Sequence, residues 1–349
     1  MKVLIAGPRS VHVSNYCRAI KKHVEEIILV SENEVDIPEA SHKYIVNLRG
    51  LNIFKWISAI RTLKNIIEKE KPDVVHVHQI NRLAFFISKA LKNLKIPFVA
   101  TAWGSDVLLV PQKNFLYKKM IASTLHRANA ITADSFSMIT AMKAIDNSNK
   151  YHLLQYGIDP IPPALKERII FSNRMHEAIY NIDNVIKYFA EFSKNHSEWQ
   201  LFVAGEGTET MNLKHLASQL NIDGKIKFLG WLDQETNNSI YARSTIYVSM
   251  PSNDGTSVSL LEAMSANCIP VVSDLPVSKE WITDGLNGII NRSGINPFEE
   301  AIKIDQKQCV QINTNKIASS AVREKTIKYF YEIYKSNYIK TKTFDKIIV

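Results

Sequence analysis

The stretch that decides the fold runs from Ser244 to Pro270 and reads STIYVSMPSNDGTSVSLLEAMSANCIP. Its first seven residues are an apolar run that predicts a buried strand, and Pro251 ends that strand. A short polar loop with Gly255 follows, and Ser257 to Ala266 then repeats apolar residues at helical spacing. The stretch therefore predicts a strand, a loop and the start of a helix.

A loop that enters a helix directs unpaired backbone N–H groups and the positive end of the helix dipole at one place, which suits a phosphate. Two acidic residues bracket this place, Asp254 in the loop and Glu262 in the helix. They are too far apart to act as one unit, but both could reach a ligand whose phosphates rest on the helix start. The spacing is equally compatible with a capping Asp254 and a solvent-facing Glu262.

Short apolar strands alternate with amphipathic helices along the whole chain, which predicts an α/β protein with doubly wound sheets. The alternation is interrupted once, at the proline-rich segment 156–163 (YGIDPIPP), which is typical of a linker. We therefore expect one domain over residues 1–160 and another over 161–323, followed by an amphipathic helix over about 324–340. The first glycine turn, AGPRSVH, does not match a dinucleotide-binding motif.

Composition is that of an ordinary globular protein, and 349 residues suffice for two separate cores. No apolar run approaches the ~20 residues of a membrane span. The first residues lack the long apolar core of a signal peptide, so we expect a cytoplasmic protein. The three cysteines show neither metal-ligand nor disulfide spacing.

The net charge of +9 is confined to the first half of the chain. Residues 1–160 hold 22 Lys and Arg against 13 Asp and Glu, whereas the remainder holds 21 of each. A basic face on one domain suits an anionic partner, either a membrane surface or a nucleic acid. A merely solvated, lysine-rich surface is the alternative.

Together with 269–274 (IPVVSD) and 279–290 (KEWITDGLNGII), the opening stretch resembles the donor-binding signature of the retaining glycosyltransferases of family 4. The family pattern is a glutamate, seven other residues and a second glutamate, and Asp254 stands in the first position here. The resemblance implies a GT-B fold, in which two Rossmann-like domains face an interdomain cleft. It also implies that the last helix packs back onto the first domain.

The resemblance implies a donor-binding set in the second domain. Arg174 corresponds to the arginine that grips the donor diphosphate, although the lysine that usually follows is missing from RMHEAIYNID. Surface exposure of Arg174 and ordinary core packing of segment 228–231 (FLGW) are the alternatives. The expected set, with Asp254, Arg174 and Glu262 as its reactive members, also includes Gly205, Gly207, Leu229, Trp231, Gly255, Thr256 and Ser257.

In the first domain, TAWGSD resembles a family loop that commonly carries a histidine, and this chain has Trp103 in its place. Asp106 or Ser105 could share the role of that histidine. His12 follows the first strand and His78 ends the strand DVVHVH, so both are candidates for acceptor contact. His76, two residues earlier on the same strand face, is better explained by core packing.

The function that the resemblance implies is retaining transfer of a sugar from a nucleotide diphosphate sugar, a UDP-sugar by expectation, to a glycan or lipid-linked glycan. We expect a role in surface polysaccharide, lipopolysaccharide or glycoconjugate synthesis, no metal or other cofactor, and peripheral binding at the inner face of the cell membrane. A GT-B nucleotide-sugar 2-epimerase and a basic nucleic-acid-binding protein are the alternatives. No recognised nucleic-acid motif supports the latter.

Overall fold

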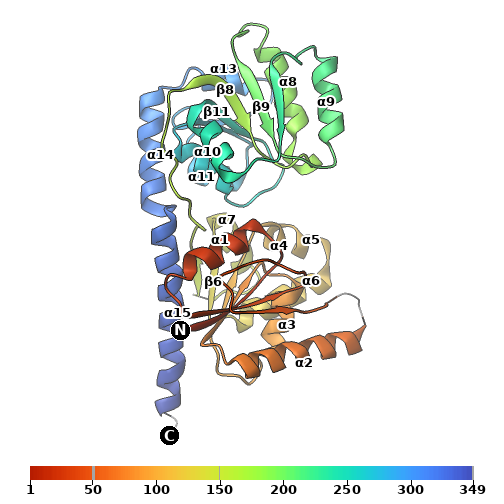
Figure 1. Cartoon of the computed structure of the whole chain (residues 1–349), viewed down its shortest axis with the longest axis vertical. Coiled ribbons are helices and arrows are strands. Elements are labelled where there is room, and N and C mark those ends of the chain that lie inside the picture. Colours follow the sequence, from red (N-terminus) through yellow and green to blue (C-terminus); the bar gives the residue numbers. More distant parts are fainter. Residues whose placement is uncertain (49–51, 149, 348–349) are drawn as a thin grey trace. The chain divides into compact units, whose positions relative to one another are not determined.

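The structure is a computed structural model that describes residues 1–48, 52–148 and 150–347 (Figure 1). The chain divides into two compact units. Unit 1 comprises Met1–Gly157 together with the chain from Arg323 onward, and unit 2 comprises Ile158–Val322. Each unit is built around its own parallel sheet.

The sheet of unit 1 has the strand order β3-β2-β1-β4-β5-β6-β7. Successive parallel strands must be joined by crossovers, and helices supply most of them. The strands are β1 (Lys2–Ala6), β2 (Glu26–Ser31), β3 (His42–Ile45), β4 (Val74–His78), β5 (Phe98–Thr101), β6 (Ala130–Ala133) and β7 (Tyr151–Leu153). The helices are α1 (Val11–Ile20), α2 (Ile53–Glu70), α3 (Arg82–Ala90), α4 (Ser105–Leu108), α5 (Val110–Lys113), α6 (Phe115–Arg127), α7 (Phe136–Lys143) and α15 (Arg323–Ile347).

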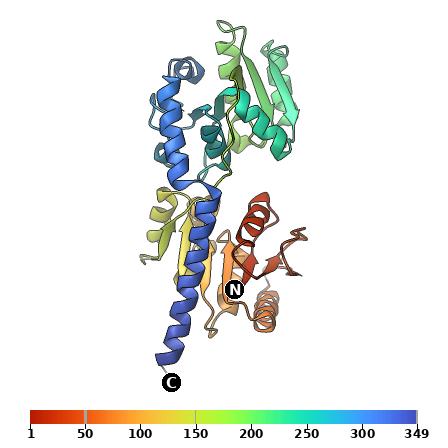
Figure 2. The same cartoon turned by 60° about the vertical axis from the view of Figure 1, so that its left-hand side comes forward.

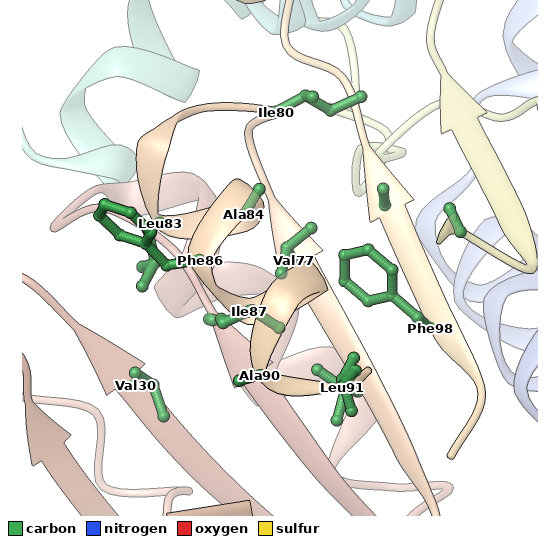
Figure 3. Close-up of a cluster of buried hydrophobic side chains, with 14 of the residues drawn as sticks. Val30, Val77, Ile80, Leu83, Ala84, Phe86, Ile87, Ala90, Leu91 and Phe98 are labelled. Carbon is green, nitrogen blue, oxygen red and sulfur yellow. The ribbon is translucent and has the colours of Figure 1, made fainter. Parts of the chain in front are cut away.

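One face of this sheet is covered by a layer in which α3 lies between α2 and α6. Figure 3 shows the buried face of α3, on which Phe86 and Ile87 lie one turn from Ala90 and Leu91, while Phe86 also meets the ring of Trp56 on α2, 5.4 Å between centroids. Side chains at this helical spacing share one face of the helix, and burying them is what holds α3 on the sheet.

The long helix α15 packs against α1 and the other face of the sheet (Figures 1 and 2). The hydroxyl of Tyr334 on α15 lies 2.6 Å from the hydroxyl of Tyr16 on α1 and 2.6 Å from Nδ1 of His76 on β4. Nε2 of His76 lies 2.6 Å from the hydroxyl of Thr101. His76 is thus a hydrogen-bonded core residue that helps to anchor α15 on unit 1.

The sheet of unit 2 has the order β10-β9-β8-β11-β12-β13. Its strands are β8 (Glu167–Ser172), β9 (Gln200–Ala204), β10 (Ile226–Gly230), β11 (Ser244–Ser249), β12 (Ile269–Val272) and β13 (Ile289–Ile290). Its helices are the 3-10 turn η1 (Ala178–Tyr180), α8 (Ile182–Phe192), α9 (Thr210–Gln219), α10 (Gln234–Arg243), α11 (Val258–Ser265), α12 (Pro276–Trp281), α13 (Pro297–Ala301) and α14 (Gln306–Ser320).

The boundary between the units lies between Gly157 and Ile158, three residues before the expected position. The reason is packing: Ile158 and Ile161 are buried in the core of unit 2. Tyr156, immediately before the boundary, packs instead with residues of unit 1. The proline-rich segment is therefore largely a part of unit 2 and not a free linker.

Candidate active site

Arg174 follows β8, and its guanidinium is held by residues that are distant in sequence. Nη2 donates a hydrogen bond to Oδ2 of Asp254 at 2.8 Å, and Nη1 donates to the hydroxyl of Ser257. The guanidinium also lies over the ring of Tyr180, with Cζ 4.5 Å from the centroid. Burial lowers the pKa of Arg174, but Asp254, Tyr247 and Tyr180 together outweigh burial and raise that pKa. The group is a fixed, permanent cation.

Asp254, the acidic residue of the loop, is therefore bound to Arg174. Oδ1 of Asp254 accepts a hydrogen bond from the backbone N–H of Gly255 at 3.0 Å, while its Oδ2 accepts from Arg174. Glu262 has a different partner: its Oε1 accepts from Nε2 of Gln234 at 3.2 Å. The two carboxylates of the signature thus bind different groups, in agreement with the expectation that they do not form one unit.

The start of α11 opens into a small pocket. Ser257 is the N-cap residue, but its side chain makes no capping hydrogen bond, since its hydroxyl turns to Arg174. The first N–H groups of the helix accordingly lack the usual side-chain cap. The cavity has a volume of about 20 Å³, enough for about one water molecule. It is lined by Ser249, Pro251, Asp254, Gly255, Thr256, Ser257, Leu260, Val272, Leu275, Val277, Ser278 and Trp281.

Several buried polar atoms at the strand ends of unit 2 have no hydrogen-bond partner within the described parts of the chain. They are the hydroxyl of Ser172, Oδ1 of Asn173 and Oδ1 of Asn291. Ser172 ends β8, Asn173 precedes Arg174, and Asn291 follows β13. A buried acceptor without a partner costs about 1–3 kcal/mol, so this edge of the sheet has unused capacity to bind polar groups.

The two glycines after β9 allow close packing of two loops. A Cβ on Gly205 would lie 2.5 Å from the carbonyl oxygen of Arg174, and one on Gly207 would lie 2.4 Å from that of His176. Gly205 also has a φ of +105°. These glycines were expected to let the backbone approach a ligand. Instead, the space beside them is filled by the loop that carries Arg174, which they hold in place.

The end of β10 presents an exposed aromatic ring. Leu229 is partly buried against the core of unit 2, whereas Trp231 is 73 % exposed. Between them, Gly230 has a φ of +64°, which turns the chain at the strand end. Core packing thus accounts for Leu229 but not for Trp231, whose ring is open to stack on a flat ligand.

In unit 1, three of the expected acceptor-side residues meet around a tyrosine that sequence reasoning missed. Nε1 of Trp103 donates to the hydroxyl of Tyr156, which lies 2.9 Å from Nδ1 of His78. The ring of His12 lies 5.6 Å from that of Trp103 and 5.9 Å from that of Tyr156, between centroids. The only sequence signal for Tyr156 is its position at the start of YGIDPIPP.

His78 is buried, and its imidazole is neutral. Burial, aided by His12, lowers the pKa of His78 to about 3. Since Tyr156 accepts the Trp103 N–H, its own O–H is left to donate to Nδ1 of His78, which places the imidazole proton on Nε2. Nε2 has no partner among the described residues. His78 therefore supports the cluster through its hydrogen bond with Tyr156, and its Nε2–H remains an unused donor within those residues.

Asp106 organises the loop in which it lies. Its Oδ2 accepts from the backbone N–H of Ile80 at 2.7 Å, and its Oδ1 accepts from that of Trp103 at 3.0 Å. The residue is 4 % exposed, and burial raises the pKa of its carboxyl. This geometry assigns Asp106 to positioning Trp103, in place of the direct contact with substrate that we expected. Ser105, at the start of α4, is exposed.

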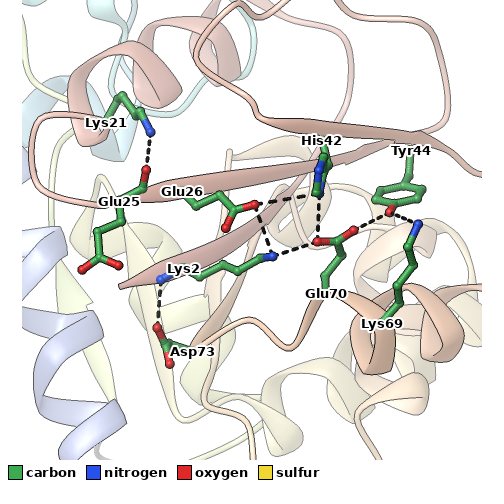
Figure 4. Close-up of polar contacts among 9 residues, drawn as sticks. All are labelled: Lys2, Lys21, Glu25, Glu26, His42, Tyr44, Lys69, Glu70 and Asp73. Atoms are coloured by element: carbon green, nitrogen blue, oxygen red, sulfur yellow. Dashed lines mark hydrogen bonds and ion pairs between the residues drawn. The ribbon is translucent and has the colours of Figure 1, made fainter.

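One group of side chains in the described residues has the spacing of metal ligands, and it lies at the opposite, amino-terminal edge of the unit 1 sheet. Glu26, His42 and Glu70 each offer one atom within 4.8 Å of the others. Figure 4 shows the ammonium of Lys2 among them, 3.2 Å from Glu26 and 2.9 Å from Glu70. A lysine therefore already supplies the positive charge at this cluster.

The comparison with protein families decides the identity of the chain. Residues 2–135 match the model "Glycosyl transferase 4-like", and residues 161–306 match "Glycosyl transferases group 1". The chain belongs to the group 1 glycosyltransferases of the family 4 type. The two matches fall in the two units, so this glycosyltransferase has the family's domain in each of them.

Similar proteins agree with this assignment. The glycosyltransferase is 20 % identical over 322 residues to N-acetyl-alpha-D-glucosaminyl L-malate synthase of Bacillus anthracis, covering 83 % of this chain and 82 % of that protein. It is 32 % identical over 91 residues to the lipopolysaccharide core biosynthesis glycosyltransferase LpsE of Rhizobium meliloti, 26 % of each chain. The crystal structure of Anabaena HepE in complex with UDP superposes with a TM-score of 0.81 at 11 % identity, covering 96 % of this chain and 100 % of that one. The fold is thus GT-B.

Among the described residues, no helix is long and apolar enough to cross a membrane.

Proposed function

We propose that this glycosyltransferase transfers a sugar from a UDP-sugar to a hydroxyl of a glycan or lipid-linked glycan, with retention at the anomeric carbon. The observation that carries the proposal is that Arg174 binds Ser257 at the uncapped start of α11, so that a guanidinium and a helix N-terminus lie side by side. A guanidinium fork and free backbone N–H groups are the groups that bind a diphosphate. HepE, which shares the fold, was crystallised with UDP.

In the proposed reaction the bond between the anomeric carbon and the diphosphate oxygen breaks, and the acceptor oxygen bonds to the same face of that carbon. The acceptor proton passes to the departing phosphate. Arg174 and the amides at Thr256 and Ser257 stabilise the charge that develops on the diphosphate, with no resident metal, and the amide of Gly255 joins them when it leaves Asp254. Glu262 binds the ribose of the nucleotide, and Trp231 lies beside the nucleobase.

The acceptor side is the ring cluster of His12, Trp103 and Tyr156, above the buried His78. Aromatic faces beside a hydroxyl and an imidazole suit the mixed apolar and polar surface of a sugar. We propose a role in surface polysaccharide or glycoconjugate synthesis, supported by the relationship to LpsE, and peripheral attachment at the inner face of the cell membrane. The comparisons lend no support to the epimerase alternative.

The test is a screen of nucleotide sugars for protection against thermal unfolding. A donor that binds the folded state stabilises it by about 2.7 kcal/mol at a hundred times its Kd. We expect a UDP-sugar to raise the Tm, and UDP alone to do so more than uridine. A protein stabilised by no nucleotide sugar, or equally by uridine and UDP, contradicts the proposed site. Turnover assays with the stabilising donor then follow, with sugar analysis to establish retention.

A further inference from the structure

We propose that unit 1 docks on anionic lipid bilayers through the first turn of α6, with aromatic side chains entering the bilayer interface. The inference rests on the proposed function, because a lipid-linked acceptor is presented at such a surface. It assigns the membrane contact to one structural element, whereas the net charge of the first half of the chain predicts only a diffuse electrostatic attraction. That element, the docking turn, comprises Phe115, Leu116, Tyr117, Lys118 and Lys119.

Every residue of the docking turn is exposed. Phe115 is 71 % exposed, Leu116 47 % and Tyr117 36 %, while Met120, the residue that follows the docking turn, is buried. Three consecutive large apolar side chains on the surface are unlike the singly scattered ones that soluble proteins tolerate. The turn is a formed helix, since Oδ1 of the N-cap residue Asn114 accepts hydrogen bonds from the N–H groups of Leu116 and Tyr117.

The charge around the turn selects an anionic surface. Between Asp73 and Asp134 the chain carries eight lysines and arginines and a single carboxylate, Asp106, which is buried. In the docking turn itself, Lys119 lies with its Nζ 4.6 Å from the ring centroid of Phe115. Aromatic side chains at the headgroup level with lysines directed to lipid phosphates are the pattern of an interfacial helix.

The position of the docking turn relates it to the acceptor side. It begins nine residues after Asp106, and of the two short helices that join them α4 packs against α5 and α5 packs against α6. The segment leaves the sheet where β5 ends, at the edge that carries Trp103. A bilayer bound at the turn therefore brings its lipids to the same edge of unit 1 as the acceptor cluster.

The structure excludes one basic residue of α6 from contact with lipid. Arg127, at the other end of α6, is used internally, because its Nη2 donates to the carbonyl oxygens of Leu91, Leu94 and Ile96 at 3.3 Å each.

The start of α2, in the same helical layer, offers a second contact of the same kind. It exposes Phe54 (76 %) and Ile57 (40 %) next to the exposed Lys55.

The first experiment is vesicle co-sedimentation of the full chain, with equal parts of phosphatidylglycerol and phosphatidylcholine or with phosphatidylcholine alone. We expect binding to the anionic vesicles only, and a loss of binding as the Debye length shrinks to ~3 Å at 1 M salt. Lys118→Gln with Lys119→Gln should weaken partitioning about thirtyfold. Phe115→Ser with Leu116→Ser should weaken it about tenfold or more, because the apolar contact is lost.

Matched controls lie in unit 2. Leu165 is 90 % exposed and Lys194 and Lys307 are exposed, so Leu165→Ser and Lys194→Gln with Lys307→Gln remove similar side chains outside the turn. These controls should leave partitioning unchanged. Equal losses in the control and docking-turn variants overturn the proposal, as does wild-type binding to neither vesicle. Because the four target side chains and the three control side chains are all exposed, unchanged unfolding curves are expected for every variant.

The second experiment reports insertion directly. All three native cysteines are buried, so Phe115→Cys introduces an exposed thiol for an environment-sensitive fluorophore, with Leu165→Cys as the control. Anionic vesicles should shift the emission of the label at 115 to the blue and leave the label at 165 unchanged. An unshifted spectrum at 115 overturns insertion. A blue shift that instead follows protein concentration without lipid assigns the turn to contact between two copies and also overturns the proposal.

Donor binding separates this inference from the proposed function. The docking-turn variants should retain protection against unfolding by the UDP-sugar, since the diphosphate site is in unit 2. If wild-type protein binds vesicles but no nucleotide sugar protects it, the proposed function fails and the docking surface stands. If the donor protects and the vesicles do not bind, only the docking surface fails.

Discussion

The guanidinium of Arg174 and the carboxylate of Asp254, 80 residues apart in sequence, form a partly buried ion pair of 2.8 Å beside the start of α11. The side chain of Arg174 is 11 % exposed, and the second basic residue usual in the family is missing. The cation that we propose as the diphosphate ligand is therefore paired with a carboxylate of the protein itself. A diphosphate must compete with Asp254 or add a further partner to Arg174.

Asp254→Asn should raise the affinity for UDP about tenfold while lowering turnover. Removing the counter-ion frees Arg174 for the phosphates, and a partly buried charged hydrogen bond is worth about 1.5–3 kcal/mol. Calorimetric titration with UDP, paired with an initial-rate assay, measures both effects. The exposed Asp274→Asn should change neither. A weaker affinity for UDP in Asp254→Asn means that Asp254 orients Arg174 and does not compete for it.

Arg174→Ala should weaken binding of UDP by about 2 kcal/mol or more and leave the affinity for uridine nearly unchanged. The reason is that Arg174 reaches only the diphosphate part of the ligand in the proposed mode. The comparison of the two affinities is the measurement, with the exposed Arg168→Ala as the control. Equal losses for uridine and UDP, or none for either, would show that Arg174 is not the diphosphate ligand.

Glu262→Ala should cost far more activity than stability. Its carboxylate is partly exposed on α11 and accepts a hydrogen bond from an exposed glutamine, so the free energy of unfolding should change by less than about 1 kcal/mol. Loss of a ribose contact should lower kcat/KM at least about tenfold. Glu191→Ala, exposed on α8, is the matched helix control. A folded Glu262→Ala protein with normal turnover would remove Glu262 from the donor site.

Tyr156→Phe should raise the KM for the acceptor and leave donor binding unchanged. The hydroxyl is the shared partner of Trp103 and His78, so its removal frees the indole and leaves buried Nδ1 of His78 without a partner. We expect a loss of about 1–3 kcal/mol in unfolding free energy from that buried nitrogen. Steady-state kinetics at saturating donor give the KM. An unchanged KM in a destabilised protein would restrict Tyr156 to a structural role.

Glu70→Gln should destabilise unit 1, and its effect should depend on pH. Burial raises the pKa of Glu70, but hydrogen bonds from Tyr44, Lys2 and His42 prevail and lower it to about 2 (Figure 4). A pKa below the unfolded value means that the carboxylate stabilises the fold above about pH 4.5 and that this contribution is lost as pH falls towards 2. Breaking a buried pair costs about 3 kcal/mol.

Urea unfolding of Glu70→Gln and wild type at pH 7 and at pH 3 measures this difference. The exposed Glu68→Gln is the control, because its ion pair with Lys64 is solvated. The difference in unfolding free energy between wild type and Glu70→Gln should be smaller at pH 3 than at pH 7. A gap of equal size at both pH values would contradict the low pKa of Glu70.

Apolar periodicity in the sequence predicts the two α/β sheets and the strand, loop and helix around Asp254 and Glu262. Apolar periodicity is local, so the strand predicted to start at Ser244 is β11 and the helix predicted from Ser257 to Ala266 is α11. It did not reveal β3, whose four residues are mostly exposed and carry no apolar run, or α14, whose apolar residues are few and scattered. Elements with little buried apolar surface leave no periodic signal.

Which polar groups meet depends on long-range packing. Sheet order places the loop after β8 beside the loop after β11, which brings Arg174 to Asp254 and Ser257. The same kind of long-range packing buries Asp106 in the Trp103 loop and joins Tyr156 to His78. It also leaves Phe115 in solvent and buries Met120 on the same helix. Such pairings depend on the relative positions of whole strands and helices, and no window of neighbouring residues contains that information.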